Sequence, residues 1–393
     1  MKVVVTCQPA TGHFHAVAPL AIAARDAGHD VVVATGRGLA PWVRRSGLEV
    51  VELGPDWLAE GPRTDQFDDQ RRRLRLMAVA TAALIPGIVE TVRERDADVV
   101  LHESLEWAGP LAADSAGVPF AALGQLPRLP RAVTAEVMSG AWTAARTRLG
   151  LDPDPGMHRL YPYLYLDSYI PSMQPLSDNP LAWFGGDRSG DVDHLVMPPL
   201  YQVPAAVPDW LTAPRTRPLV YMTMGTAFNE FPHLFRALAD GLRDEDVDVV
   251  MTVGSGVDVD AVGIDAPNVR VVDYVPQEEI LSRTDVLVQH SGYLTTVGAL
   301  RHGVPMVVVP VAVDQPYHAH RLAAAGVAIR LSEAEATATR LRESVRAVLD
   351  DDLYRRNAAR LQAELHAMPP VERGIELLER LAATGKPVLR DDA

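Results

Sequence analysis

Short β-branched runs alternate with alanine-rich helical stretches along the first hundred residues. Residues 3–6, 31–34 and 99–101 are apolar runs of strand length, and residues 17–27 have the composition of a helix. Gly28 follows the helical stretch, at the position where glycine commonly ends a helix. Strands and helices that alternate in this way predict parallel β-α-β units.

The same alternation returns in the second half of the chain. The expected buried parallel strands there are residues 219–223, 247–253, 269–273, 286–289 and 306–309. Residues 197–218 separate the two halves and contain six prolines, a density that is typical of a stiff linker because proline disfavours helix and central strand. Helical material follows at 334–365 and, after Pro369 and Pro370, at 372–383.

These patterns predict an α/β protein with two doubly wound, Rossmann-like domains. The expected boundaries are an N-terminal domain over residues 1–200, a proline-rich linker over 201–217 and a C-terminal domain over 218–370. Residues 371–393 are expected to form a last helix that packs back on the N-terminal domain.

Composition and charge narrow the choice of partners. The 393 residues carry 51 acidic and 37 basic side chains, a formal net charge of −14 that disfavours nucleic acid. Cys7 is the single cysteine, which excludes an intrachain disulfide and suits a reducing cytoplasm; we expect a buried thiol at a strand end. No secretion signal is expected at the start, and the apolar stretch 76–89 is too short to span a bilayer and predicts a buried helix.

The richest candidate site follows the strand expected at 286–289. The sequence there is H-S-G-Y-L-T-T, from His290 to Thr296, and it leads into a helix. Glycine allows close backbone approach, while hydroxyls and the free amides of a helix start favour an anion such as a diphosphate. The turns 223–226 and 313–315 follow other strands of the same sheet, so three loops are expected to meet at one crevice.

An ordered set of motifs resembles the bacterial GT-B glycosyltransferases of natural-product biosynthesis, whose acceptors include macrolides, enediynes and aromatic polyketides. The resemblance covers nearly the whole chain, and it implies two Rossmann-like domains that face each other across a cleft. The matching motifs are G-H-F-H at 12–15, P-L-A at 19–21, A-G-H at 27–29, V-P-Q at 275–277, H-x-G-x-x-T at 290–295, G-V-P at 303–305 and D-Q at 314–315.

The resemblance implies that the C-terminal domain binds the nucleotide-sugar donor. His290, Gly292 and Thr295 would bind its diphosphate with help from Ser291. The other donor residues that it implies are Gly225 and Thr226, which would approach from the opposite loop, Val275 beside the nucleobase, and Asp314 with Gln315 at the sugar hydroxyls. Asp314 has an alternative interpretation as a helix N-cap.

Sugar transfer to a hydroxyl needs a base, and histidine is the usual choice. The family places its catalytic histidine at the position of His13; His15 is the alternative and is expected to pack or to line the acceptor site. Glu103 is the candidate partner that would orient His13. The family usually has aspartate there, so the longer side chain would shift the pairing, with His102 as a possible interference; unpaired, Glu103 would be a solvated carboxylate.

Other signals have ordinary explanations. The basic run 71–75 is typical of a solvated helix face, with contact to a membrane surface or an acidic acceptor as the alternative. D-x-D triplets at 96–98 and 246–248 precede strands, the wrong edge for a metal beside a diphosphate. Aromatic and apolar side chains outside the strands suit a hydrophobic or aromatic aglycone, although half or more are expected in the core: Trp57, Phe67, Met77, Trp107, Met138 and Trp142.

The resemblance therefore implies an inverting glycosyltransferase of the cytoplasm that needs no metal and no cofactor besides its sugar donor. UDP-sugar users of this group commonly carry a glutamate for the ribose eight residues after the H-x-G histidine, where this chain has Gly298, so we expect a dTDP-linked deoxysugar. Tight packing of a helix is the alternative role for Gly298. The alternative functions are a cell-wall glycosyltransferase with a lipid acceptor and an inert sugar-nucleotide-binding protein.

Overall fold

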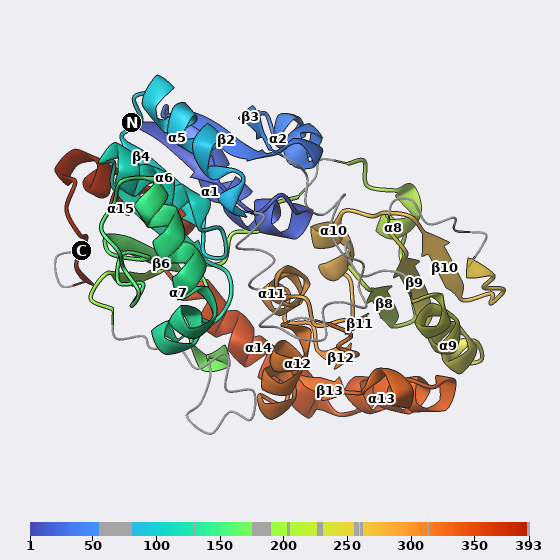
Figure 1. The fold of residues 1–393 in the computed structure, drawn as a ribbon. Helices are drawn as coiled ribbons and strands as arrows, with labels where there is room; N and C mark the ends of the chain where they lie inside the picture. Colours follow the sequence, from blue (N-terminus) through green and yellow to red (C-terminus); the bar gives the residue numbers. More distant parts are fainter. Residues whose placement is uncertain are drawn as a thin grey trace. The chain divides into compact units, whose positions relative to one another are not determined.

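The chain forms two compact units, each built on one parallel sheet (Figure 1). A computed structural model describes residues 1–54, 81–128, 130–174, 190–202, 205–225, 231–254, 259, 262–312 and 314–390. The first unit combines Met1–Tyr201 with Met368–Ala393, and the second is Gln202–Ala367. The prediction of two doubly wound α/β domains is confirmed.

The sheet of the first unit has seven strands among the described residues, in the order β3-β2-β1-β4-β5-β6-β7. Every neighbouring pair is parallel. The strands are β1 (Lys2–Thr6), β2 (Asp30–Gly36), β3 (Glu49–Leu53), β4 (Val99–Glu103), β5 (Phe120–Gly124), β6 (Leu164–Asp167) and β7 (Asp193–Leu195). The helices are α1 (Thr11–Asp26), α2 (Ala40–Arg45), α5 (Ile85–Glu94), α6 (Ala108–Ala116), α7 (Arg131–Arg148) and α15 (Val371–Thr384), with short 3₁₀ turns at Arg37–Leu39 and Pro171–Met173.

Side chains of the central strand β1 alternate between two buried cores. Val3 and Val5 pack into the core formed with α1 and α15, whereas Val4 packs into the core formed with α5, α6 and α7. Strands covered on both faces need apolar residues at every position, which explains the continuous rather than alternating hydrophobic runs in the sequence. Cys7 is fully buried in the first core, as expected.

Helix α15 belongs to the first unit although the whole second unit, Gln202–Ala367, separates it in sequence from that unit's other helices. Its buried stripe includes Ile375, Leu378 and Leu381, spaced as one face of a helix, and it packs against α1 and β6. The stripe completes the core on one face of the sheet.

The sheet of the second unit has six strands among the described residues, in the order β10-β9-β8-β11-β12-β13, again all parallel. The strands are β8 (Leu219–Thr223), β9 (Asp248–Thr252), β10 (Val269–Val272), β11 (Val286–Gln289), β12 (Met306–Val308) and β13 (Ala328–Arg330). The helices are α8 (Asp209–Thr212), α9 (Pro232–Leu242), α10 (Gln277–Leu281), α11 (Tyr293–Arg301), α12 (Gln315–Ala324), α13 (Ala338–Asp350) and α14 (Asp352–His366), with a 3₁₀ turn at Glu333–Glu335.

Several local expectations need correction. The first helix begins at Thr11 rather than near residue 17. Phe14, in its first turn, is already buried in the core. The stretch 76–89 is not one helix: residues 76–80 lie outside the described residues, and α5 begins at Ile85 because Pro86 fits only the first turn of a helix. The proline-rich segment contains the single-turn helix α8, which Pro208 precedes without blocking it.

In the described part of the chain, every helix is too short or too polar to cross a lipid bilayer.

Burial of α15 gives a prediction about stability. Leu378 is fully buried, so Leu378→Ala is expected to lower the free energy of unfolding of the first unit by about 2–5 kcal/mol. Leu389→Ala removes the same atoms from a side chain that is 41% exposed and is the matched control, with an expected change below about 0.5 kcal/mol. Urea unfolding followed by circular dichroism measures both, and equal losses would show that α15 does not stabilise this unit.

Candidate active site

His13 and Glu103 meet at the carboxyl ends of β1 and β4. These strands are neighbours at the point where the strand order reverses, which is where doubly wound sheets commonly bind ligands. His13 lies in the first turn of α1 and Glu103 is the last residue of β4. His13 Nδ1 lies 2.8 Å from Glu103 Oε2. The pair has the arrangement of a base and the carboxylate that orients it.

Glu103 is buried and accepts hydrogen bonds at both carboxylate oxygens. It is therefore not the solvated loop carboxylate of the alternative expectation. Its Oε1 accepts from the backbone N–H of Leu105 at 2.9 Å and from the amide of Gln125 at 3.1 Å. Burial opposes ionisation, but the charge and hydrogen bond of His13, with these two donors, outweigh it and hold the pKa of Glu103 below its usual value. The carboxylate is therefore charged at neutral pH.

The two neighbouring histidines do not compete for this carboxylate. His15 packs between the rings of Trp42 and Tyr201, and burial lowers its pKa to about 4. His102 is fully buried, stacks on Tyr161 and directs Nδ1 to backbone carbonyls, and burial lowers its pKa to about 4 as well. The expected interference of His102 with the His13–Glu103 contact is thus wrong.

A second buried carboxylate, Glu106, supports the loop that follows β4. It accepts from the hydroxyl of Thr6 and from the N–H groups of Ala108 and Gly109 at the start of α6. Burial raises the pKa of Glu106 to about 7 against the effect of these donors. Sequence reasoning missed both Glu106 and Gln125; a polar residue directly after a buried strand was the available signal for Gln125.

In the second unit, the ring of His290 lies between two glycines that come from different loops. A Cβ atom on Gly225, after β8, would lie 2.7 Å from the ring, and one on Gly292 would lie 2.4 Å from its Nε2. Both positions therefore require glycine while the ring stays in place. Burial lowers the pKa of His290 to about 4, so the imidazole is neutral, and its Nδ1 has no hydrogen-bond partner among the described residues.

The start of α11 carries the other residues of the expected diphosphate site. Ser291 adopts a positive φ of 71°, and its hydroxyl is buried without a partner in the described ranges. Thr295 accepts a long contact of 3.5 Å from Gln277. Helix α11 begins at Tyr293, earlier than the expected start near residue 297. Its first turn therefore directly follows His290, Ser291 and Gly292.

Asp314 and Gln315 lie after β12, at the start of α12. Asp314 does not cap α12 with its side chain; its carboxylate pairs with His318 at 2.9 Å instead. Gln315 is buried, and its Oε1 accepts from the N–H groups of Val311 and Ala312, each at 2.9 Å. The side-chain oxygen of Gln315 is therefore engaged by its own loop.

Val275 and Gly298 are closely surrounded by other residues of the second unit. Val275 is buried within its unit at 2% exposure, whereas Tyr274 beside it is 44% exposed. A Cβ atom on Gly298 would lie 2.9 Å from Leu281 Cδ1, so α10 packs closely on this position. Thr226 lies outside the described residues.

The side chains proposed for an acceptor pocket are mostly accounted for by the core. Trp107, Met138 and Trp142 are at most 3% exposed and belong to the core around α5, α6 and α7. Trp57, Phe67, Met77 and the basic run 71–75 lie outside the described residues. The acidic triplets 96–98 and 246–248 lie at the amino ends of β4 and β9, away from the candidate sites.

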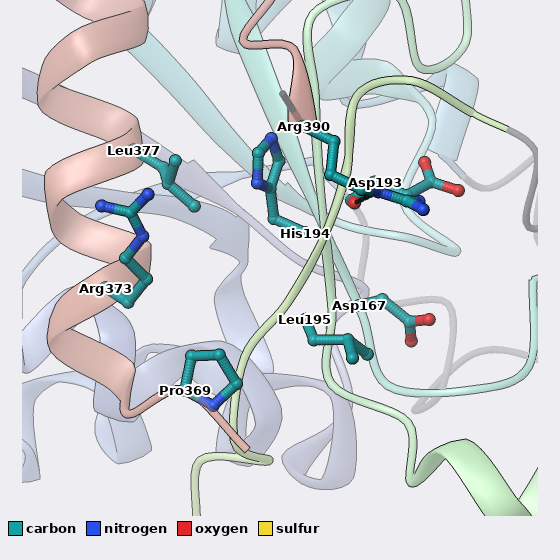
Figure 2. A pocket seen from close by; sticks show the side chains of 8 residues that line it. All are labelled: Asp167, Asp193, His194, Leu195, Pro369, Arg373, Leu377 and Arg390. Carbon is teal, nitrogen blue, oxygen red and sulfur yellow. Dashed lines mark hydrogen bonds between the residues drawn. The ribbon is translucent and has the colours of Figure 1, made fainter. Parts of the chain in front are cut away.

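A hollow of about 350 Å³ lies elsewhere in the first unit, between α15 and β7 (Figure 2). Its lining residues are Asp167, Asp193, His194, Leu195, Pro369, Arg373, Leu377 and Arg390. Arg128 binds Asp193 with contacts of 2.7 and 2.8 Å, and the N–H of Tyr169 donates to Asp167. This hollow includes neither His13 nor Glu103.

Comparison with known proteins identifies the family of this chain. Residues 236–381 match the family described as "Erythromycin biosynthesis protein CIII-like, C-terminal domain". The L-demethylnoviosyl transferase of Streptomyces niveus is 31% identical over 378 residues, which cover 93% of this chain and 94% of that protein. The chain belongs to the family of natural-product glycosyltransferases.

Two further relatives of this glycosyltransferase extend the comparison. The aclacinomycin-T 2-deoxy-L-fucose transferase of Streptomyces galilaeus is 27% identical, with 98% of this chain and 96% of that protein covered. The crystal structure of the glycosyltransferase VinC in complex with dTDP has a TM-score of 0.80 at 25% identity and covers 98% of this chain and all of that chain. The similarity extends through both units and agrees with a GT-B architecture.

Proposed function

We propose that this glycosyltransferase moves a deoxysugar from a dTDP-linked donor to a hydroxyl of a hydrophobic or aromatic natural-product aglycone, with inversion at the anomeric carbon. The 2.8 Å contact between His13 and the buried Glu103 carries the proposal. Glu103 is ionised and accepts a hydrogen bond from the N–H of His13 Nδ1, so Nε2 of His13 is the atom that is free to take a proton.

The reaction is then a single displacement. Nε2 of His13 removes the proton of the acceptor hydroxyl, the oxygen attacks the anomeric carbon, and the bond to the diphosphate breaks. Glu103 stabilises the imidazolium that forms. Transfer to a carbon of a phenol would use the same base.

The second unit provides the groups for the leaving diphosphate. Neutral His290 can donate a hydrogen bond, and the first N–H groups of α11 carry the positive end of the helix dipole. Gly225 and Gly292 allow the backbone to come close to the ligand. We propose that these groups replace a metal ion in stabilising the negative charge.

The role of His13 is tested by His13→Ala. We expect turnover to fall by about 10² to 10⁴, the usual contribution of a positioned base, while the dissociation constant for dTDP changes less than about twofold. Single-turnover rates and calorimetric titration measure the two effects. His233→Ala, at an exposed histidine of the second unit, is the control and should keep full turnover. Near-native turnover of His13→Ala with a hydroxyl acceptor would remove His13 from the mechanism.

Metal independence is tested by chelation. Activity is expected to survive EDTA unchanged, because His290 and the start of α11 supply the charge stabilisation. The rate is measured before and after EDTA and again after Mg²⁺ or Mn²⁺ is added. Loss on chelation with recovery on adding metal would contradict the proposal.

The nucleotide is tested by donors that differ only in the nucleoside. Gly298 offers a ribose no side-chain acceptor, and a 2′-hydroxyl buried without a partner costs about 1–3 kcal/mol. We therefore expect kcat/KM for a dTDP-sugar to exceed that for the matching UDP-sugar by about tenfold or more. The VinC complex with dTDP is consistent with this preference. Equal values, or a preference for UDP, would leave Gly298 with a packing role only.

A further inference from the structure

Glu103 has one methylene more than an aspartate, which gives its carboxylate more conformations to lose. The structure shows what restricts it. Oε1 accepts from Leu105 N and from Gln125 Nε2, which leaves Oε2 for His13. A side chain that is held at one oxygen presents the other in a fixed direction.

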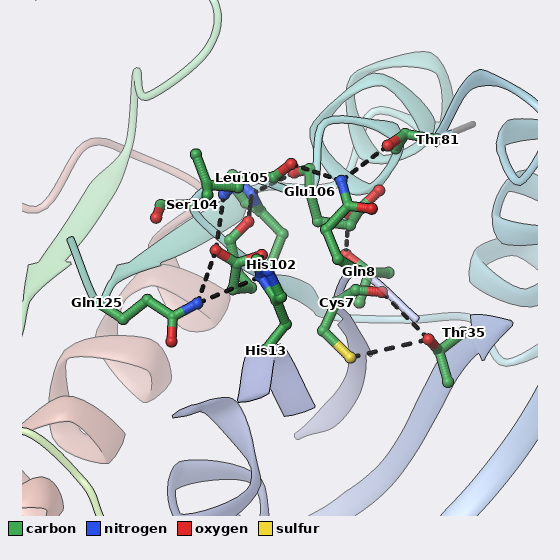
Figure 3. Close-up of polar contacts among 12 residues, drawn as sticks. Cys7, Gln8, His13, Thr35, Thr81, His102, Ser104, Leu105, Glu106 and Gln125 are labelled. Carbon is green, nitrogen blue, oxygen red and sulfur yellow. Dashed lines mark hydrogen bonds and ion pairs between the residues drawn. The ribbon is translucent and has the colours of Figure 1, made fainter. Parts of the chain in front are cut away.

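The pairing of β4 with β5 places Gln125 beside Glu103. Gln125 directly follows β5, which pairs with β4 so that Glu103 lies opposite Leu123. The side chain of Gln125 points toward His13 (Figure 3). Its amide also reaches the carboxylate of Glu103 at the end of β4. Gln125 is 8% exposed, so little water competes for the contact.

The positions of the protons follow from the same three groups. Gln125 Nε2 lies 3.1 Å from Glu103 Oε1 and 3.3 Å from His13 Nδ1. An ionised carboxylate only accepts hydrogen bonds, so both the amide and Nδ1 must direct a proton to it. With Nδ1 protonated, the amide does not donate to the ring, and Nε2 of His13 is left unprotonated.

We propose that Gln125 is a positioning residue that acts through Glu103: it holds Oε1 so that Oε2 keeps His13 in the tautomer with a free Nε2. The inference rests on the proposed function of His13 as the base. The opposing interpretation is that Gln125 only fills space beside β4.

The variant Gln125→Met tests the proposal, because methionine keeps the length of the side chain and removes the donor. We expect kcat to fall about tenfold, the usual effect of losing one hydrogen bond to a charged group, with KM for the donor unchanged. Gln174→Met removes an amide that donates to Asp167 in the same unit and is the matched control, with native kcat expected. Native kcat for Gln125→Met would overturn the proposal.

A double-mutant cycle with Glu103→Gln separates action through Glu103 from space filling. Without the carboxylate, Gln125 has nothing to orient, so Gln125→Met should cause no further loss in the Glu103→Gln background. The same tenfold loss in both backgrounds would show that Gln125 acts independently of Glu103 and would overturn the proposal.

The tautomer of His13 gives a readout that needs no substrate. Nitrogen-15 chemical shifts of the His13 ring should show protonated Nδ1 in the parent protein and a mixture of tautomers in Gln125→Met. An unchanged tautomer in the variant would overturn the proposal even if activity fell. A changed tautomer together with full activity of His13→Ala would instead support the positioning and refute the proposed function, so the two failures are distinguishable.

Discussion

The reversal of strand order is the constraint on which both candidate sites depend. In the first sheet it falls between β1 and β4, and in the second between β8 and β11. Connections leave the two strands of such a pair toward opposite faces, which opens space at their carboxyl ends. His13 and Glu103 lie at the carboxyl ends of the first pair, and Gly225 and His290 follow the second. Residues far apart in the chain are thus brought into contact without any long loop.

A fully buried charge beside β4 makes strict demands on its neighbours. An unpaired carboxylate in this environment would be strongly destabilising, so donors must converge on it. Three of them do so from three segments: the ring of His13, the backbone of Leu105 and the amide of Gln125. The requirement for solvation of one charge therefore fixes the orientation of the imidazole as well. His102, next in sequence to Glu103, is excluded because successive side chains of a strand point to opposite faces.

The second unit shows the opposite situation, because some of its buried hydrogen-bonding groups have no partner among the described residues. His290 is neutral and tightly enclosed by Gly225 and Gly292, and its Nδ1 and the hydroxyl of Ser291 have no partner among the described residues. Unsatisfied buried groups are costly and are typical of ligand sites. Gln315, in contrast, has its side-chain oxygen bound to the backbone of its own loop.

The sequence by itself determined the fold class and the family. Continuous apolar runs mark parallel strands that are buried on both faces, and the glycine and histidine motifs after them can be read directly from the sequence. It also indicated His13 and Glu103 as a candidate pair, with His15 as the alternative histidine, since these residues follow the strands expected from the sequence. Only the tertiary structure decided which histidine meets the carboxylate, that Trp107 and Trp142 belong to the core, and that Gln125 reaches Glu103. These outcomes depend on strand register and on the direction of each side chain, and a one-residue shift in register would reverse them without changing the hydrophobic pattern of any single segment.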